Sequence, residues 1–574
     1  MQLNFQYIIK IIVCFFVFHS VLVCKSQKKS WEQDCFKKII ETIGNKSLSE
    51  PKFKIEVNLG EIAKYNPNSK TIFIDQKLID ICKEFGKDST NCLAFILSHE
   101  LMHHYLEHGF LNRSVKKEYK EFSFMDNLKV LSRDSLKRLE MEAQSDLKGG
   151  FYTFLAGYNS LDIAPDLLDT LYKRYGLASN SQNYPSLEER KKIVYKQQEK
   201  LKRLKNIYQA STFSFIAEEY KFAIDGFEKI ISEGFISKEI FNNLGLIFIK
   251  YAVSKMDHEN LLGYPFEYDA KNRLNNPSTR AVNNFQFIEN LLDEGSNYFD
   301  QALGLDPNYE IAHINKSSSY SVLAELYSKN EKERFNYIQK ALISNNIICE
   351  FENNTNLEEF LASKELIKKA FVKAKEDIKK LIKNKSKISE SDINKIVLSA
   401  ILLNQLGDTT KALKILAKTK KMGSAIAELN HNLLSGLSNT LNESYVIKKN
   451  PSIKNEVLDS FNPNIILSGF GEFEEPFEKY RFNKCKQYVK DFPNSTAYLF
   501  DKRKKFFVHY TNYLSTNSGV KIGDNPQILK EIFKVDPIII NGNSEIYLHY
   551  PENEIIFVVQ NNKIKKWAIY RNEK

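Results

Sequence analysis

The hydrophobic and polar positions between residues 51 and 80 follow the two-residue period of β-strands. Phe53–Val57 alternates, Thr71–Asp75 is rich in β-branched and aromatic residues, and Asn66–Ser69 between them has the composition of a turn. The pattern predicts two strands. We expect either a strand beside the helix that follows, where an extended peptide can pair with its edge, or a hairpin that only packs.

The period changes to that of helices over residues 88–147. Leu93–Leu97 is an apolar run that follows four candidate N-cap residues, and it predicts a helix that continues to His108. The candidate caps are Asp88, Ser89, Thr90 and Asn91. A second capping cluster at Ser132–Ser135 predicts another helix, which extends through Leu147.

Lys- and Glu-rich helical patterning takes over after about Gln198. Aromatic and small residues recur within it, around Tyr220–Phe227, Tyr298–Pro307 and Leu406–Leu413. This recurrence resembles tetratricopeptide repeats, which are helix pairs that bury their apolar faces by stacking on neighbouring pairs. The alternative is an ordinary helical domain in which Ala and Gly mark close helix contacts. A repeat array would offer its concave face to a protein partner or substrate.

The last sixty or so residues return to two-fold alternation. Glu545–Tyr550, Ile555–Val559 and Lys563–Tyr570 predict an antiparallel meander, and a short helix is expected around Gln527–Phe533. We expect a small α+β module that binds or docks another molecule.

The composition is that of a chain with several folded domains. It has 574 residues, of which 43% are hydrophobic and 27% charged, and its formal net charge is +11. The positive charge comes from scattered lysines rather than an arginine-rich block. The composition therefore argues against nucleic acid as a ligand.

The amino-terminal residues resemble a secretory signal. Lys10 precedes an apolar run at 11–23, and Cys24 and Ser26 are small residues before a cleavage point at Gln27. We expect a signal peptide over residues 1–26, with lipidation of Cys24 or an uncleaved anchor as alternatives. No later segment has the apolar length of a membrane span, so the part of the chain after the signal is expected to be soluble outside the cytosol.

Cysteine is sparse in the rest of the chain, where five residues remain: Cys35, Cys82, Cys92, Cys349 and Cys485. In an oxidising compartment a Cys82–Cys92 or a Cys35–Cys82 bridge can form. Buried unpaired thiols are the alternative.

Four of the ten histidines fall between His99 and His108. His99 and His103 are four residues apart, so a helix places both imidazoles on one face, where they can bind one metal ion. Glu100 follows the first histidine, and its carboxylate can act as a general base toward water at that metal. The alternative is a polar helix face with incidental histidines.

A catalytic zinc ion takes three protein ligands and keeps one position open. Charge alone leaves Glu140 and Glu142, on the second predicted helix, as rival third ligands. Asp146 is four residues after Glu142 and is expected to orient a ligand imidazole through its free N–H.

The spacing of these residues resembles the M48 family of zinc metallopeptidases. The chain has His99-Glu100-x-x-His103, then Glu142-x-x-x-Asp146, Gly149 and Ala156-Gly157-Tyr158, in the order of the family's HExxH, ExxxD, glycine and AGY elements. The turn at Ala63–Lys70 and His108 also match, and the resemblance covers about Lys52–Gln198. It implies one Zn²⁺ held by His99, His103 and Glu142, with Asp146 behind them and Glu100 as the catalytic base.

One part of the family pattern differs. Members often carry a His-Pro pair and a downstream Arg, where this chain has Tyr184-Pro185 and Arg190. A tyrosine hydroxyl can donate to a developing oxyanion, so Tyr184 is a candidate donor, and packing of a loop is its alternative role. His104 and His108 point away from the ligand face and are expected on the surface or beside the ligands.

Together these features predict a mainly α fold. A zincin-like α+β metallopeptidase domain is expected at 27–198, a tetratricopeptide-like helical region at 199–450 and the α+β module at 451–574. The resemblance implies a zinc endopeptidase of envelope protein quality control, whose helical region holds protein or peptide clients. The alternative is a non-proteolytic adaptor or chaperone with a latent zinc site.

Overall fold

The computed structural model describes residues 30–46, 48–106, 133–177, 186–256, 262–265, 285–344, 390–436, 476–477, 487–492, 495–500, 504–509, 516, 518–541 and 546–572. Contacts divide the chain into two compact units, residues 1–41 with 50–195, and residues 42–49 with 196–574. The predicted signal peptide, His108 and Tyr184 lie outside the described residues.

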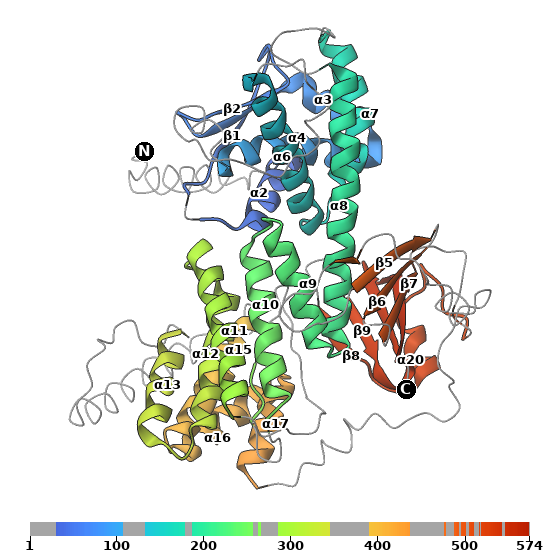
Figure 1. The fold of residues 1–574 in the computed structure, drawn as a ribbon. Helices are drawn as coiled ribbons and strands as arrows, with labels where there is room; N and C mark the ends of the chain where they lie inside the picture. Colours follow the sequence, from blue (N-terminus) through green and yellow to red (C-terminus); the bar gives the residue numbers. More distant parts are fainter. Residues whose placement is uncertain are drawn as a thin grey trace, which may run out of the picture. The chain divides into compact units, whose positions relative to one another are not determined.

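The first unit combines a three-stranded sheet with α-helices (Figure 1). Its elements are α2 (Trp31–Ile43), β1 (Lys52–Glu56), β2 (Ala63–Asn66), β3 (Thr71–Asp75), α3 (Gln76–Glu84), α4 (Ser89–Tyr105), α6 (Arg133–Leu155) and α7 (Ser160–Tyr175). The sheet order is β1-β3-β2, with β1 parallel and β2 antiparallel to β3. The alternative of a hairpin between the two predicted strands, β1 and β3, is therefore wrong, because these strands are parallel. The turn at Asn66–Ser69 instead joins β3 to the unpredicted strand β2, and β1 reaches β3 by a longer connection.

Helices α4 and α6 approach each other closely because Gly149 has no side chain. A Cβ at this position would lie 2.8 Å from Ser98 Oγ and 3.1 Å from the Ser98 carbonyl carbon on α4. α6 ends at Leu155, and Gly157 just beyond it has a φ of +86°, which suits glycine. The Tyr158 N–H donates to the Thr153 carbonyl at 2.8 Å, which is the closing bond of a Schellman cap. These glycines set the position and length of α6 against α4.

The cysteines of the first unit are buried free thiols. Cys35, Cys82 and Cys92 form no disulfide, and burial raises the pKa of Cys35 and of Cys92 to about 12. Of the two possibilities that the sequence left open for these three residues, buried unpaired thiols are confirmed, because the three side chains are packed as small apolar groups in the core.

The second unit begins with helices that pack on their neighbours in the chain. They are α8 (Leu187–Ile216, which starts in the first unit), α9 (Tyr220–Ser232), α10 (Lys238–Val253), α11 (Phe285–Leu305), α12 (Glu310–Leu326), α13 (Glu331–Ser344), α15 (Glu390–Gln405), α16 (Thr409–Lys420) and α17 (Ala425–Leu434). α10 packs on α11, α12 on α13 and α15 on α16. A Cβ at Gly245 would meet the Gly295 carbonyl oxygen at 2.8 Å, so α10 and α11 are in backbone contact. The predicted helical character of this region is confirmed.

An eight-stranded antiparallel sheet completes the second unit (Figure 1). Its order is β4-β5-β6-β7-β11-β10-β9-β8, and its strands are β4 (Pro476–Phe477), β5 (Gln487–Phe492), β6 (Ser495–Phe500), β7 (Lys504–His509), β8 (Ile538–Asn541), β9 (Ile546–Tyr550), β10 (Ile555–Gln560) and β11 (Lys563–Asn572). The predicted meander is confirmed as β9, β10 and β11, and the predicted helix as α20 (Ile528–Phe533). Strands β4 to β8 were not predicted.

Both faces of β10 are buried, which explains its continuous apolar sequence. Ile555, Phe557 and Val559 pack in one cluster with α20, whereas Ile556 and Val558 pack in another with α8. Alternate residues of a strand point to opposite faces, so burial on both sides removes the polar positions of the alternation.

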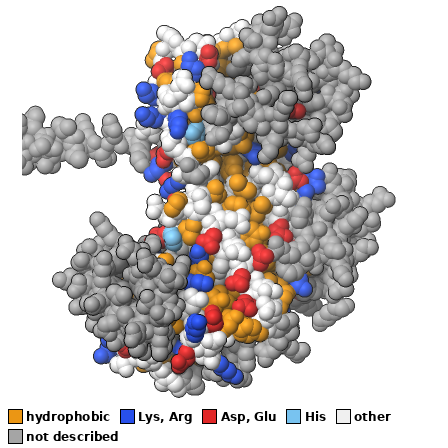
Figure 2. Space-filling view, turned by 60° about the vertical axis from the view of Figure 1, so that its left-hand side comes forward, with side chains coloured by type: hydrophobic (Ala, Val, Ile, Leu, Met, Phe, Trp, Pro, Cys, Tyr) orange, Lys and Arg blue, Asp and Glu red, His pale blue; other side chains and the backbone are white. Residues whose placement is uncertain are grey.

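The described surface carries mixed charge. Figure 2 shows blue and red side chains interspersed among orange ones over the described part of one face, rather than gathered into one positive block. This fits the scattered lysines of the sequence. In the part of the chain that the structure describes, no helix has both the length and the apolar character of a membrane span.

Candidate metal centre

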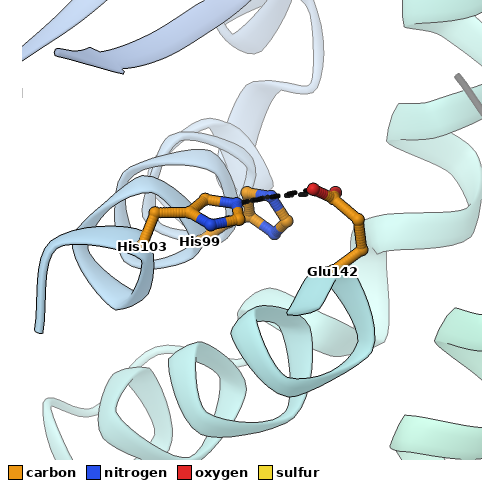
Figure 3. A group of neighbouring side chains, drawn as sticks. All are labelled: His99, His103 and Glu142. Atoms are coloured by element: carbon orange, nitrogen blue, oxygen red, sulfur yellow. Dashed lines mark hydrogen bonds and ion pairs between the residues drawn. The ribbon is translucent and has the colours of Figure 1, made fainter. Parts of the chain in front are cut away.

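Two imidazoles of α4 face one acidic residue of α6. Figure 3 shows His99 and His103 on one helix and the Glu142 carboxylate pointing toward them from the other. His99 Nε2 lies 3.3 Å from Glu142 Oε2, and His103 Nε2 lies 3.5 Å from Glu142 Oε1. The two Nε2 atoms are 3.1 Å apart. Among the described residues this is the group of His, Cys, Asp and Glu side chains whose ligand atoms gather closely enough to hold a metal.

These separations fit zinc. Zinc binds imidazole nitrogen and carboxylate oxygen at about 2.0–2.2 Å in tetrahedral sites, which places ligand atoms about 3.4 Å apart. The three measured distances of 3.1, 3.3 and 3.5 Å lie around that value. Two histidines and one carboxylate also leave a fourth position open, as catalytic zinc sites do. The donor set and its spacing are therefore suitable for a catalytic zinc ion.

Asp146 holds the ring of His99 from behind. Its Oδ1 lies 2.8 Å from His99 Nδ1, and its side chain is fully buried. An ionised carboxylate only accepts hydrogen bonds, so Nδ1 carries the proton and Nε2 faces Glu142. One turn of helix separates Glu142 from Asp146, which lets α6 supply both the carboxylate at Nε2 and the one at Nδ1.

Arg190 of α8 holds Asp146 in turn. Its Nη2 donates to Asp146 Oδ1 at 2.9 Å, and its Nη1 lies 2.7 Å from Asp146 Oδ2 as an ion pair. Arg190 also reaches Glu142 Oε2 at 3.6 Å. The guanidinium therefore compensates the negative charges of the buried Asp146 and of the half-buried Glu142.

A capping box at the start of α8 places Arg190 in its first turn. The Glu189 N–H donates to Ser186 Oγ at 3.3 Å, and Glu189 Oε2 accepts from the Ser186 N–H at 2.9 Å. This Ser-x-x-Glu signal is readable in the sequence, where Arg190 was matched to the family pattern without a role. The contact of Arg190 with Asp146 joins residues 44 positions apart and has no local signal.

The charges of the cluster shift its pKa values in opposite directions. Burial alone would lower the pKa of His99, but the carboxylates of Glu142 and Asp146 raise it to about 10. Burial alone would raise the pKa of Glu142, but His99, Arg190 and His103 bring it far below its usual range. In the metal-free site, therefore, the positive charges of Arg190 and of a doubly protonated His99 balance the negative charges of Glu142 and Asp146.

Glu100 lies between α4 and the edge strand β2. Burial raises the pKa of its carboxyl to about 7, helped by Glu142 and opposed by His99 and by a backbone hydrogen bond from Tyr65. A carboxyl with a pKa near neutrality can both take up and give back a proton at physiological pH. The Tyr65 N–H ties this carboxyl to the strand that borders the site.

The other sequence candidates occupy different places. Glu140, the rival ligand, is half-buried and stands outside the cluster, which Glu142 completes. His104 is buried rather than on the surface, and its Nδ1 lies 2.7 Å from the hydroxyl of Tyr65 on β2. Tyr184 and His108 fall outside the described residues.

Comparisons with known proteins assign no family to this chain. No protein-family model matches it, and no curated protein matches it. One solved structure, the crystal structure of the P58(IPK) TPR domain, is 14% identical in an alignment that covers 65% of this chain and 99% of that one, with a TM-score of 0.16. A TM-score of this size does not establish a shared fold.

Proposed function

We propose that the chain is a zinc-dependent endopeptidase that cleaves protein or peptide clients. The observation that carries the proposal is the convergence of His99, His103 and Glu142 at the separations of a zinc ligand set, with Asp146 on the outer nitrogen of His99. The resemblance to the M48 metallopeptidases supports the same assignment. When bound, zinc would supply the Lewis acidity that activates water and polarises the peptide carbonyl.

Glu100 is the general base of this proposal. It follows a ligand histidine, and burial holds the pKa of its carboxyl near 7. Its carboxylate would accept the proton of the attacking water and then give it to the leaving amine. The Tyr65 N–H bond to this carboxylate limits its rotation.

The edge of β2 suits an extended substrate. β2 is an outer strand of the sheet, and its residues Ala63–Asn66 pair with β3 on one side only. Residues on an edge strand present N–H and C=O groups that an extended chain can pair with. Because Tyr65 of this strand also contacts Glu100, a peptide paired with β2 would bring its carbonyl groups next to the base.

The helical region is the proposed client-binding part, as a tetratricopeptide-like array, and the periplasm or cell envelope is the proposed location. An adaptor or chaperone with a latent zinc site is the competing function, since the same ligands would serve it. Cleavage separates the two proposals. The endopeptidase predicts that purified protein cleaves unfolded casein, that a chelator stops cleavage, and that added zinc restores it. Chelator-insensitive cleavage, or none with any client, favours the adaptor.

Zinc affinity should rise with pH. Zinc must displace the second proton of His99, whose pKa in the metal-free site is about 10. Below that pH each unit of increase should strengthen binding about tenfold, because one proton is released per metal bound. Competition titrations against a chelator of known affinity, at several pH values from about 6 to 8, measure the slope after correction for the chelator's own protonation. An affinity that does not change with pH would contradict the protonated His99.

A further inference from the structure

Two residues on one face of α4 contact the same residue of β2. Glu100 and His104 are four positions apart, so the helix places both side chains on one side. The Glu100 carboxyl accepts a hydrogen bond from the Tyr65 N–H, and His104 Nδ1 lies 2.7 Å from the Tyr65 hydroxyl. The main chain and the side chain of Tyr65 are therefore both bound to the helix that carries the proposed base.

The register of β2 explains why the Tyr65 N–H reaches α4. The Asp75 N–H donates to the Ile62 carbonyl at 3.1 Å, so the main-chain groups of Ile62 face β3. In an antiparallel pair these groups alternate in direction from one residue to the next. Those of Tyr65, three residues on, thus point to the outer edge of the sheet, where the Glu100 carboxyl accepts the N–H. The geometry of this bond depends on where the main chain of β2 lies relative to α4.

The pair of Tyr65 and His104 holds the strand in that place. β2 has four residues and pairs with β3 on one side only, so its main chain is attached at few points. The Tyr65 and His104 rings meet edge to face, with centroids 5.3 Å apart and planes at 64°. His104 is buried, which shields the bond between the two side chains from water. The pair is thus a second attachment of β2, directed at α4 instead of at β3.

We propose that Tyr65 and His104 are positioning residues of the peptidase reaction, whose hydrogen bond holds β2 against α4 so that the Tyr65 N–H keeps the Glu100 carboxylate directed at the attacking water. The inference rests on the proposed function, and it adds two residues outside the metal ligand set. A reacting group misplaced by about 1 Å can cost about 100-fold in rate. Loss of the bond should therefore lower kcat, because orientation of the base is needed only in the transition state.

The Tyr65→Phe variant of the full-length chain tests the proposal, because it keeps the ring and removes only the hydroxyl. We expect kcat on a quenched-fluorescence peptide to fall at least about tenfold, with KM within about twofold of the wild type and zinc content unchanged. Tyr175→Phe is the matched control. The Tyr175 hydroxyl donates to Asp75 Oδ2 at 3.2 Å in the same unit, away from Glu100, so its loss should leave kcat as in the wild type.

Substitutions of His104 test whether the bond itself acts. An asparagine amide can occupy the place of Nδ1 and keep a hydrogen bond with the Tyr65 hydroxyl, so His104→Asn should keep most of the wild-type kcat. His104→Leu should lose as much as Tyr65→Phe does. The double variant Tyr65→Phe/His104→Leu should be no slower than either single variant, because all three lack the same bond.

A positioning role also differs from general damage to the unit. If Tyr65 acts through Glu100, then Tyr65→Phe should not reduce further the residual rate of the Glu100→Gln enzyme, whereas general damage would lower that rate again. A Tyr65→Phe enzyme with wild-type kcat, or a second loss in the Glu100→Gln enzyme, would overturn the inference and leave the endopeptidase intact.

A wild type that cleaves no client would refute the endopeptidase instead, and hydrogen exchange would still test the bond. The amides of residues 63–66 should exchange faster in Tyr65→Phe than in Tyr175→Phe, because β2 has lost its attachment to α4. Equal exchange in the two variants would show that the hydroxyl does not hold the strand.

Discussion

Replacing Glu100 by glutamine should abolish proteolysis while zinc remains bound. The amide keeps the size of the side chain but accepts no proton, so we expect kcat to fall by about 100- to 10,000-fold, the usual contribution of a general base. Zinc content and the unfolding transition should stay as in the wild type, because Glu100 is not one of the three converging ligands. Steady-state cleavage of a quenched-fluorescence peptide measures the loss.

Glu140→Gln is the matched control for this change. Glu140 is also partly buried, in the helix that carries Glu142, but it lies outside the cluster. It should keep wild-type turnover. A Glu100→Gln enzyme that cleaves as fast as the Glu140→Gln enzyme would remove the base from the mechanism.

Replacing Arg190 by methionine should destabilise the first unit by about 3–5 kcal/mol, the cost of leaving a buried charge without its partner. Asp146 would stay buried, and Glu142 would lose part of its compensation, because Arg190 contacts both carboxylates. We expect the helices α4 and α6 to exchange their amide hydrogens faster in the metal-free variant. Hydrogen exchange followed by mass spectrometry reports on these helices separately from the second unit.

An exposed arginine of the same unit provides the comparison. Arg174 pairs with Glu84, and about half of each side chain is exposed. Arg174→Met should cost no more than about 1 kcal/mol, as exposed ion pairs usually do. If both arginine variants exchange alike, the buried pair with Asp146 does not stabilise the site.

The local half of the candidate site was predictable from the sequence. The four-residue spacing of His99 and His103 defines a helix face whatever the rest of the fold, and the spacing of Glu142 and Asp146 does the same on the second helix. Choosing Glu142 rather than Glu140 as the third ligand requires knowledge of which face of α6 is turned toward α4. Charge alone left it open, and the family resemblance favoured the residue that the structure brings to the histidines.

The parts that depend on distant contacts were not predictable. Strand β2 has four residues and no strong alternation, and it exists because it pairs with β3 and covers His104 through Tyr65. The contact of Arg190 with Asp146 also joins residues far apart in the chain. Local patterns carry no information about such pairs. For the same reason the sequence left disulfides and buried thiols open for Cys35, Cys82 and Cys92, since compartment and spacing do not reveal packing.

The zinc content of purified protein tests the central claim most directly. After dialysis against a weak chelator and reloading with zinc, wild-type protein and the Glu140→Ala control should each hold about one zinc ion per chain, as one catalytic site requires. Glu142→Ala should retain less than about a tenth of that amount, because two histidines alone bind zinc weakly. A Glu142→Ala protein that holds as much zinc as the wild type, or a wild type that holds none, would contradict a metal centre built from α4 and α6.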